Sequence, residues 1–313
     1  MKIYPIREIE ANPTQEGFAR MIPDVTFTKR ERDELQMQIL QPWALTDEDG
    51  ENRLYPAVVF VQGSGWTFPQ VHFEIPQLSQ LARQGYVVAT ITHRNLEDGH
   101  RAPAYLEDVK TAIRFLRAHS EDLHIDPKRL GIWGTSSGAN AALLAALTID
   151  DPKYKTDEWP EETDAVNFVV DCFAPVDTMK LVKRFEVSVN TAKESLTKLS
   201  IEEQEEQTKA LASLQTNLQN FVGSPDGSVD MALVRELSPL ERIDIRKTYP
   251  PVLILHGDQD HLVEYEQSLK LYEAFKDHGT EVEMIRVIGG EHEGNFWSQE
   301  VLDAIWEFIA RHS

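Results

Sequence analysis

Short apolar runs alternate with amphipathic stretches along most of the chain. Short apolar runs predict strands buried on both faces at 57–61, 87–91, 167–172 and 252–256, and further strands are predicted at 130–133 and 282–288. Apolar residues at helical spacing predict helices at 74–84, 104–119, 137–147 and 296–311. This alternation is typical of an α/β fold, a mainly parallel sheet with helices on both faces.

Two regions depart from that alternation. Residues 25–40, VTFTKRERDELQMQIL, hold two alternating stretches around a charged turn and predict an antiparallel hairpin. Residues 178–236 are rich in Glu, Lys and Gln and carry no strand pattern, which indicates either a solvated helical face or a helical insertion covering a site. We expect one domain, 1–313, with 178–236 as a helical cap. Four apolar residues recur in it at helical spacing and either face the pocket or bury the insertion: Leu211, Leu214, Leu218 and Phe221.

Composition narrows the classes of partner. The 313 residues are 41% hydrophobic and 27% charged, as in soluble globular proteins, and the net charge of −21 disfavours nucleic acid and anionic membranes. The single cysteine, Cys172, allows no intrachain disulfide. No apolar segment resembles a signal peptide or a membrane span, so we expect a cytoplasmic protein, although a chain trimmed of a leader would look the same. Self-association into a homo-oligomer stays open.

The pentapeptide Gly134-Thr135-Ser136-Ser137-Gly138 matches G-x-S-x-G. It lies directly after a predicted strand and directly before a predicted helix, the setting of a nucleophile elbow. The turn is tight, so glycines are needed on both sides of Ser136, whose hydroxyl would project above the sheet edge. An ordinary helix start with a capping serine is the plainer interpretation, and the strand–turn–helix setting favours the nucleophile.

A serine nucleophile needs a base and an orienting acid, which follow it here in the order acid, then histidine. Asp258 and Asp260 both follow the strand at 252–256, and His292 lies in a glycine loop after the last strand. We favour Asp260, because Gly257-Asp258 is typical of a turn whose aspartate caps its own loop. His292 is preferred as base because His261 adjoins the acid and His256 ends a strand.

Acyl transfer also needs donors for an oxyanion. We expect the backbone N–H of Ser137 and that of Gly65 or Trp66, from the loop after the first parallel strand. Its glycines do not form a dinucleotide motif, because Phe68 stands in place of the third glycine. The chain contains no P-loop, H-E-x-x-H or C-x-x-C sequence, so we predict no cofactor and no metal.

Together these motifs resemble the α/β-hydrolase superfamily, in particular the esterase/lipase branch with the bifunctional acetylxylan/feruloyl esterases and, more distantly, the hormone-sensitive-lipase-like esterases. The family's H-G-G-x-W motif corresponds to 62–66, and its H-G-D-x-D-x-x-V motif to 256–263, which places the acid at Asp260. Gln62 stands where the family has His, and Ser64 where it has Gly. After the elbow, Gly138-Ala139-Asn140 replaces the common G-G-H.

The resemblance also suggests roles outside the triad. Trp66 and Asn140 are expected to contact substrate. A family-like Y-R segment appears as His93-Arg94, and Arg94 is expected either to pair with Asp108 beneath the site or to remain a separate surface charge.

The resemblance implies a serine carboxylic ester hydrolase that works through an acyl-enzyme. Its expected substrates are short-acyl or feruloyl esters of carbohydrates or related small molecules. Two alternatives are an amidase-type hydrolase, either arylformamidase or peptidase-like, and a non-catalytic binding protein on the same fold.

Overall fold

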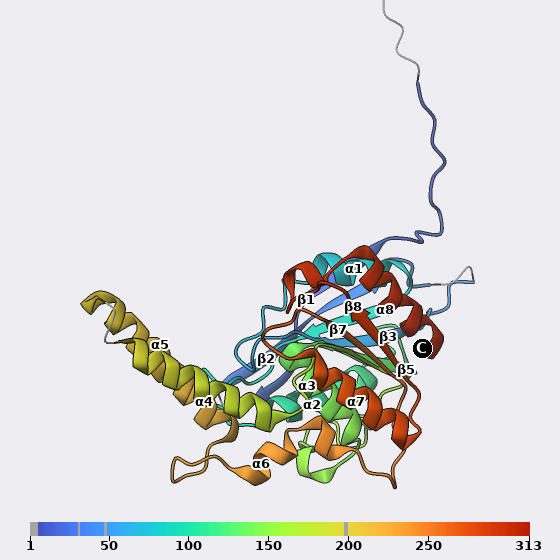
Figure 1. The fold of residues 1–313 in the computed structure, drawn as a ribbon. Coiled ribbons are helices and arrows are strands. Elements are labelled where there is room, and N and C mark those ends of the chain that lie inside the picture. Colours follow the sequence, from blue (N-terminus) through green and yellow to red (C-terminus); the bar gives the residue numbers. More distant parts are fainter. Residues whose placement is uncertain (1–5, 31, 47–48, 197–199) are drawn as a thin grey trace, which may run out of the picture.

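A computed structural model describes residues 6–30, 32–46, 49–196 and 200–313, and its centre is one eight-stranded sheet (Figure 1). The strand order is β1-β2-β4-β3-β5-β6-β7-β8. The strands are β1 Ala19–Arg30, β2 Asp33–Pro42, β3 Tyr55–Val61, β4 Val87–Ile91, β5 Ile125–Thr135, β6 Val169–Cys172, β7 Val252–Gly257 and β8 Val282–Val287.

Strand directions confirm the predicted fold class. In the part of the sheet that runs β4-β3-β5-β6-β7-β8, each neighbouring pair of strands is parallel. β1 and β2 form an antiparallel hairpin, and β2 joins the sheet by pairing antiparallel with β4. Parallel strands end at the same edge, so the loops after β3, β5, β6, β7 and β8 meet there. The register places Val61 beside Gly134, and Thr135 beside Cys172.

Helices cover both faces of the sheet. They are α1 Ile75–Arg83, α2 Ala104–Ala118, α3 Ser136–Leu147, α4 Thr178–Ser195, α5 Ile201–Val222, α6 Met231–Glu236, α7 Tyr265–His278 and α8 Gln299–His312. α1 and α8 pack with one set of strand side chains, including Val58 and Phe60. α2, α3 and α7 pack with the opposite set, including Val59 and Ile132, so the alternation of buried side chains along each strand fills two cores.

The structure adds one helix to the sequence-based assignment and moves the start of another. α7 connects the parallel strands β7 and β8, a crossover that parallel pairing requires. α8 begins at Gln299 rather than 296, because Gly294–Phe296 form a 3₁₀ turn and the Ser298 hydroxyl accepts a hydrogen bond from the Val301 amide at 3.2 Å.

α4 and α5 form a helical hairpin that projects from the body of the molecule (Figure 1). Residues 197–199, between the two helices, lie outside the described residues. The outer part of α5 is mostly exposed and begins with a capping box, in which Ser200 and Glu203 exchange hydrogen bonds. Its last turn is buried at Phe221 and Val222. The segment is thus helical, as predicted, but only its root packs on the body.

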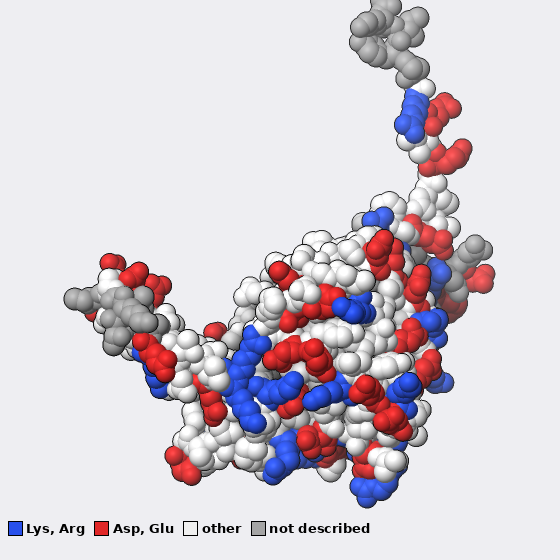
Figure 2. Space-filling view, viewed as in Figure 1, with Lys and Arg blue, Asp and Glu red and all other residues white. Residues whose placement is uncertain are grey.

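Surface charge is mixed on the visible face of the body, where acidic and basic side chains are interspersed, while acidic side chains gather towards the outer end of the hairpin (Figure 2). Within the described ranges, no helix is both long and apolar enough to cross a membrane.

Candidate active site

Ser136 lies at the sharp turn between β5 and α3. Its φ of 50° is in the left-handed region, which a non-glycine residue rarely adopts. A Cβ at Gly134 would lie 2.4 Å from the carbonyl oxygen of Gly138, and one at Gly138 would lie 2.0 Å from that of Val61. Both glycines are therefore required by close packing, which explains the G-x-S-x-G spacing.

Three side chains from the ends of different strands meet at this edge. His292 Nε2 lies 3.0 Å from Ser136 Oγ, and His292 Nδ1 lies 2.7 Å from Asp260 Oδ2. A carboxylate only accepts, so His292 donates from Nδ1 and presents a lone pair on Nε2 to the serine hydroxyl. This tautomer is the one that can remove a proton from Ser136.

Asp260 is held as a carboxylate by four donors. Oδ1 accepts from the amides of Leu262 and Val263 at 2.8 and 2.9 Å, and Oδ2 faces His292 and His256. Burial alone would raise the pKa of Asp260, but the hydrogen bonds from His256, His292 and Val263 outweigh it and hold that pKa below its ordinary value. The group stays negative and fixes the orientation of His292.

His256 also contacts Asp260, although the sequence predicts only that it ends a strand and packs. It is fully buried at the end of β7, with Nε2 3.1 Å from Asp260 Oδ2 and 2.9 Å from the Val263 carbonyl oxygen. Both partners are acceptors, so Nε2 carries the proton. The spacing of four between His256 and Asp260 in the H-G-D-x-D motif was the available signal.

Asp258 points to a different partner. Its carboxylate accepts from Arg286 Nε at 2.9 Å and from the Gly289 amide at 2.7 Å. These bonds tie the loop after β7 to the loop after β8, which carries His292, and they lower the pKa of Asp258. Asp258 thus braces two loops and makes no contact of its own with His292.

The loop after β3 approaches the elbow through its backbone. The Gly63 amide donates to Thr135 Oγ1 at 2.8 Å, and the Ser64 amide donates to Ser137 Oγ at 2.9 Å. Gly65 and Trp66 follow with φ of 61° and 60°. In the part of the chain that the structure describes, the amides of Gly65 and Trp66 donate to no protein acceptor, so they are available to an oxyanion.

This arrangement agrees with the matches to known proteins. A model of the BD-FAE family, a group of α/β-hydrolase esterases, matches residues 45–275. The chain belongs to the BD-FAE family. It is 27% identical to Esterase LipC of Mycobacterium tuberculosis (strain ATCC 25618 / H37Rv) over 241 residues, which cover 76% of this chain and 52% of LipC. The chain spans about half the length of the curated relatives it matches.

Solved structures establish the α/β-hydrolase fold for this BD-FAE member. A truncated form of a carbohydrate esterase from gut microbiota superposes with a TM-score of 0.71 at 21% identity, covering 96% of this chain and 99% of that one. An acetyl ester-xyloside bifunctional hydrolase from Caldicellulosiruptor lactoaceticus gives a TM-score of 0.65 at 20% identity, covering 96% and 98%.

The root of the helical hairpin touches two loops at the catalytic edge of the sheet. Phe221, at the end of α5, lies over the buried ring of Trp66 with ring centroids 4.2 Å apart. Arg184 of α4 donates to the His261 carbonyl oxygen in the acid loop and pairs with Glu264 at 3.5 Å. The insertion therefore contacts the loop after β3 through α5 and the loop after β7 through α4.

Asn140 lies inside the protein. It is fully buried in α3, and its amide nitrogen donates to the carbonyl oxygens of Pro175 and Leu237 at 2.9 and 3.1 Å. Tyr105 approaches its oxygen at 3.3 Å. These contacts join α3 to the segments that flank the hairpin and use both amide hydrogens of Asn140.

Arg94 and Asp108 do form the predicted pair. The guanidinium of Arg94 lies 2.9 Å from the buried carboxylate of Asp108, and the Arg94 amide donates to the same group at 2.8 Å. Arg30 of β1 adds a second cation at 2.7 Å. The pair fixes the start of the loop after β4 to α2.

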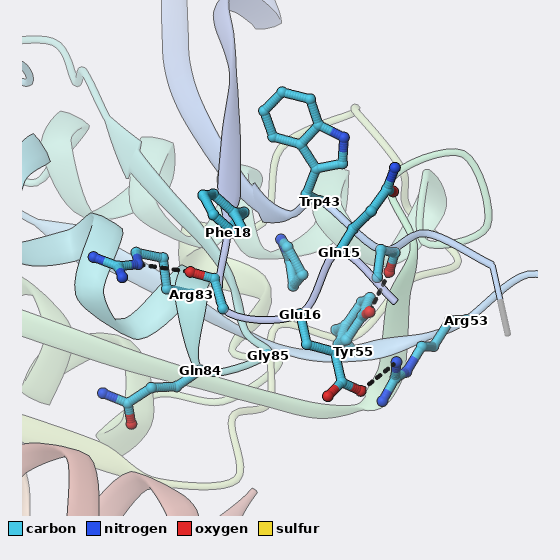
Figure 3. Close-up of a pocket in the computed structure, with 12 residues that line it drawn as sticks. Gln15, Glu16, Phe18, Trp43, Arg53, Tyr55, Arg83, Gln84 and Gly85 are labelled. Atoms are coloured by element: carbon cyan, nitrogen blue, oxygen red, sulfur yellow. Dashed lines mark hydrogen bonds and ion pairs between the residues drawn. The ribbon is translucent and has the colours of Figure 1, made fainter. Parts of the chain in front are cut away.

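Two other features lie away from the catalytic edge. Glu281, Glu283 and His312 could together face a cation, but Arg311 already pairs with Glu283 at 2.7 Å. A pocket of about 360 Å³ lies beside Tyr55 at the start of β3, with Trp43 and Phe18 at its rim (Figure 3). The pocket lies where β3 begins, whereas Ser136 lies at the other edge of the sheet, where the parallel strands end. The pocket is therefore not part of the triad site.

Proposed function

We propose that this protein is a serine carboxylic ester hydrolase with Ser136 as nucleophile, His292 as base and Asp260 as the orienting acid. The observation that carries this proposal is the hydrogen-bonded chain from Ser136 Oγ through His292 to Asp260, with 3.0 and 2.7 Å between its members. His292 takes the Ser136 proton as the serine oxygen attacks the ester carbonyl. The amides of Ser137, Gly65 and Trp66 stabilise the oxyanion.

The same groups complete the reaction. His292, now protonated, gives its proton to the leaving alcohol, and the acyl group stays on Ser136. Water then attacks the acyl-enzyme with His292 again as base, which releases the acid and restores the serine. Ser136, His292 and Asp260 form one hydrogen-bonded chain through which the proton moves, and no step needs a metal or a cofactor.

For substrate, we propose short-acyl esters, acetyl first, or feruloyl esters of carbohydrates or related small molecules. The similar structures named above include a carbohydrate esterase and an acetyl ester-xyloside hydrolase. Trp66 is proposed to contact the substrate, and the cap role of 178–236 is proposed for the root of the hairpin, where Phe221 covers Trp66. Asn140 is expected to support the packing of α3 from inside the protein, because both hydrogens of its amide are already bonded to backbone carbonyl oxygens.

A hydrolysis panel tests the proposal. It compares 4-nitrophenyl acetate with the decanoate, acetylated xylose with methyl ferulate, and an acetanilide as the amide analogue, with Ser136→Ala as the control. We expect acetyl esters to exceed decanoyl esters in kcat/KM. Preferred cleavage of the anilide would make the protein an amidase, and equal rates for the wild type and Ser136→Ala would remove the serine mechanism.

A further inference from the structure

One buried amide side chain closes the neck of the loop that carries the oxyanion donors. Gln62 is 7% exposed and stands at the end of β3. Its carbonyl oxygen accepts from the backbone amide of Gln70, and its Nε2 donates to Glu74 Oε1 at 3.1 Å. One side chain thus joins the start of the loop to two points on its return.

Glu74, the partner, is an unusual carboxyl. It directly precedes α1, and its second oxygen, Oε2, is buried without a hydrogen-bond partner among the described residues. The pKa of Glu74 is raised to about 7, mainly by burial and with a contribution from the like charge of Glu293, while the bond from Gln62 opposes the rise. Glu293 follows His292 directly, so Glu74 is close enough to the loop that carries His292 to feel its charge.

The tip of the loop is shaped by local bonds that do not reach Glu74. Ser64 and Thr67 exchange side-chain hydrogen bonds at 2.6 and 2.7 Å. These bonds fix the turn that contains Gly65 and Trp66, and the Trp66 carbonyl oxygen accepts from the Leu96 amide at 3.0 Å. The start of the loop is held at the elbow by the Gly63 and Ser64 amides, and Gln62 adds the bond that fastens it to the helix start at Glu74.

We propose that Gln62 and Glu74 are positioning residues that hold the neck of the oxyanion loop closed and keep the Gly65 and Trp66 amides aimed at the reacting carbonyl. Both backbone conformations at the tip are left-handed, and the surrounding structure has to maintain them. The inference rests on the proposed ester hydrolysis. It adds two groups that touch no substrate and act through the backbone donors.

The test measures kcat and KM on 4-nitrophenyl acetate for Gln62→Ala, Glu74→Ala and Glu74→Gln. The oxyanion exists only in the transition state, so the two alanine variants should lower kcat by about 10–100-fold and change KM by less than about threefold. Glu74→Gln keeps an oxygen that accepts from Gln62 and should retain wild-type kcat within about threefold. Gln70→Ala is the matched control, because only its backbone amide is used.

Several outcomes would overturn the inference. One is a wild-type kcat in Gln62→Ala. Another is a rise in KM at unchanged kcat in the two alanine variants, and a third is an equal loss of kcat in Gln62→Ala and Gln70→Ala. Circular dichroism checks the fold, and if Gln62→Ala does not fold, the comparison of Glu74→Ala with Glu74→Gln decides alone. Ser136→Ala separates the two proposals. An active Ser136→Ala removes ester hydrolysis by Ser136, whereas an inactive one beside a fully active Gln62→Ala removes only the positioning role.

Discussion

The triad side and the oxyanion side of the candidate site are held together in different ways. On the triad side, Asp260 accepts from amides two and three positions away, and Asp258 bridges the ends of the adjacent strands β7 and β8. On the oxyanion side, the Ser64 amide depends on Ser137 and the Trp66 ring on Phe221. Ser64 and Ser137 also follow adjacent strands, β3 and β5, so the two sides differ at Trp66, whose ring depends on the distant helix α5.

This difference indicates which part of the helical hairpin affects the site. Its outer part is exposed, but its root packs on Trp66, next to one of the expected oxyanion donors. Changes at the root should therefore affect chemistry, whereas changes further out should not. On the triad side, the contrast between Asp260 and Asp258 separates orientation of His292 from bracing of its loop.

The largest effect is expected on the triad side. Asp260→Asn removes the acceptor that fixes the tautomer of His292 and should lower kcat by about 10³–10⁴-fold. Asp258→Asn should lower kcat by less than about tenfold, and should act mainly by lowering the melting temperature through its bonds to Arg286 and Gly289. Steady-state kinetics and thermal melts on both variants check this ranking, and the reverse ranking in equally folded proteins would exchange the two roles.

A smaller effect is expected at the hairpin root. Phe221→Ala removes the ring that covers Trp66 and should cost about 3 kcal/mol of folding free energy together with about a tenfold loss of kcat/KM. Leu214→Ala is the matched control on the same helix, because Leu214 is 38% exposed, and should change stability by less than about 0.5 kcal/mol. Urea unfolding and kinetics measure both. Equal effects would mean that the root has no special role.

The smallest effect on activity, and a distinct one on stability, is expected for Glu74→Gln. The pKa of Glu74 is raised from 4.5 to about 7, so the folded protein retains a proton that the unfolded chain has lost between these values. Wild-type stability therefore falls as the pH rises through this window and stays lower above it. Glu74→Gln should be the more stable protein at pH 8, by up to about 3 kcal/mol, with this advantage absent at pH 4. The same difference in stability between Glu74→Gln and the wild type at pH 4 and pH 8 would contradict the raised pKa of Glu74.

The two sides also differ in how far the sequence predicts them. The G-x-S-x-G elbow, the carboxylates after β7 and the histidine loop after β8 are local patterns, and the structure brings Ser136, Asp260 and His292 together. Their catalytic roles stay predictions. Most strands of the parallel sheet were predicted from short apolar runs, whereas β8, VEMIRV, mixes charged with apolar residues and is only partly buried. The helix α7 was missed although the pairing of β7 with β8 requires a crossover.

Other side-chain contacts between separate elements could not be predicted from the sequence. Gln62 was noted only as a departure from the family motif, and its bond to Glu74 depends on where α1 begins. Asn140 was expected at the substrate, yet its position in α3 places it among the carbonyl groups of Pro175 and Leu237. Neither contact is set by spacing, because each depends on how separate elements pack.

Covalent labelling tests the central claim most directly. The native protein is treated with a fluorophosphonate, digested, and analysed by mass spectrometry, with Ser136→Ala and His292→Ala in parallel. We expect one equivalent of label on the peptide that contains Ser136, none in Ser136→Ala, and labelling slowed by about 10³-fold or more in His292→Ala. An unlabelled wild type, or a label on another serine that persists in Ser136→Ala, would contradict the account.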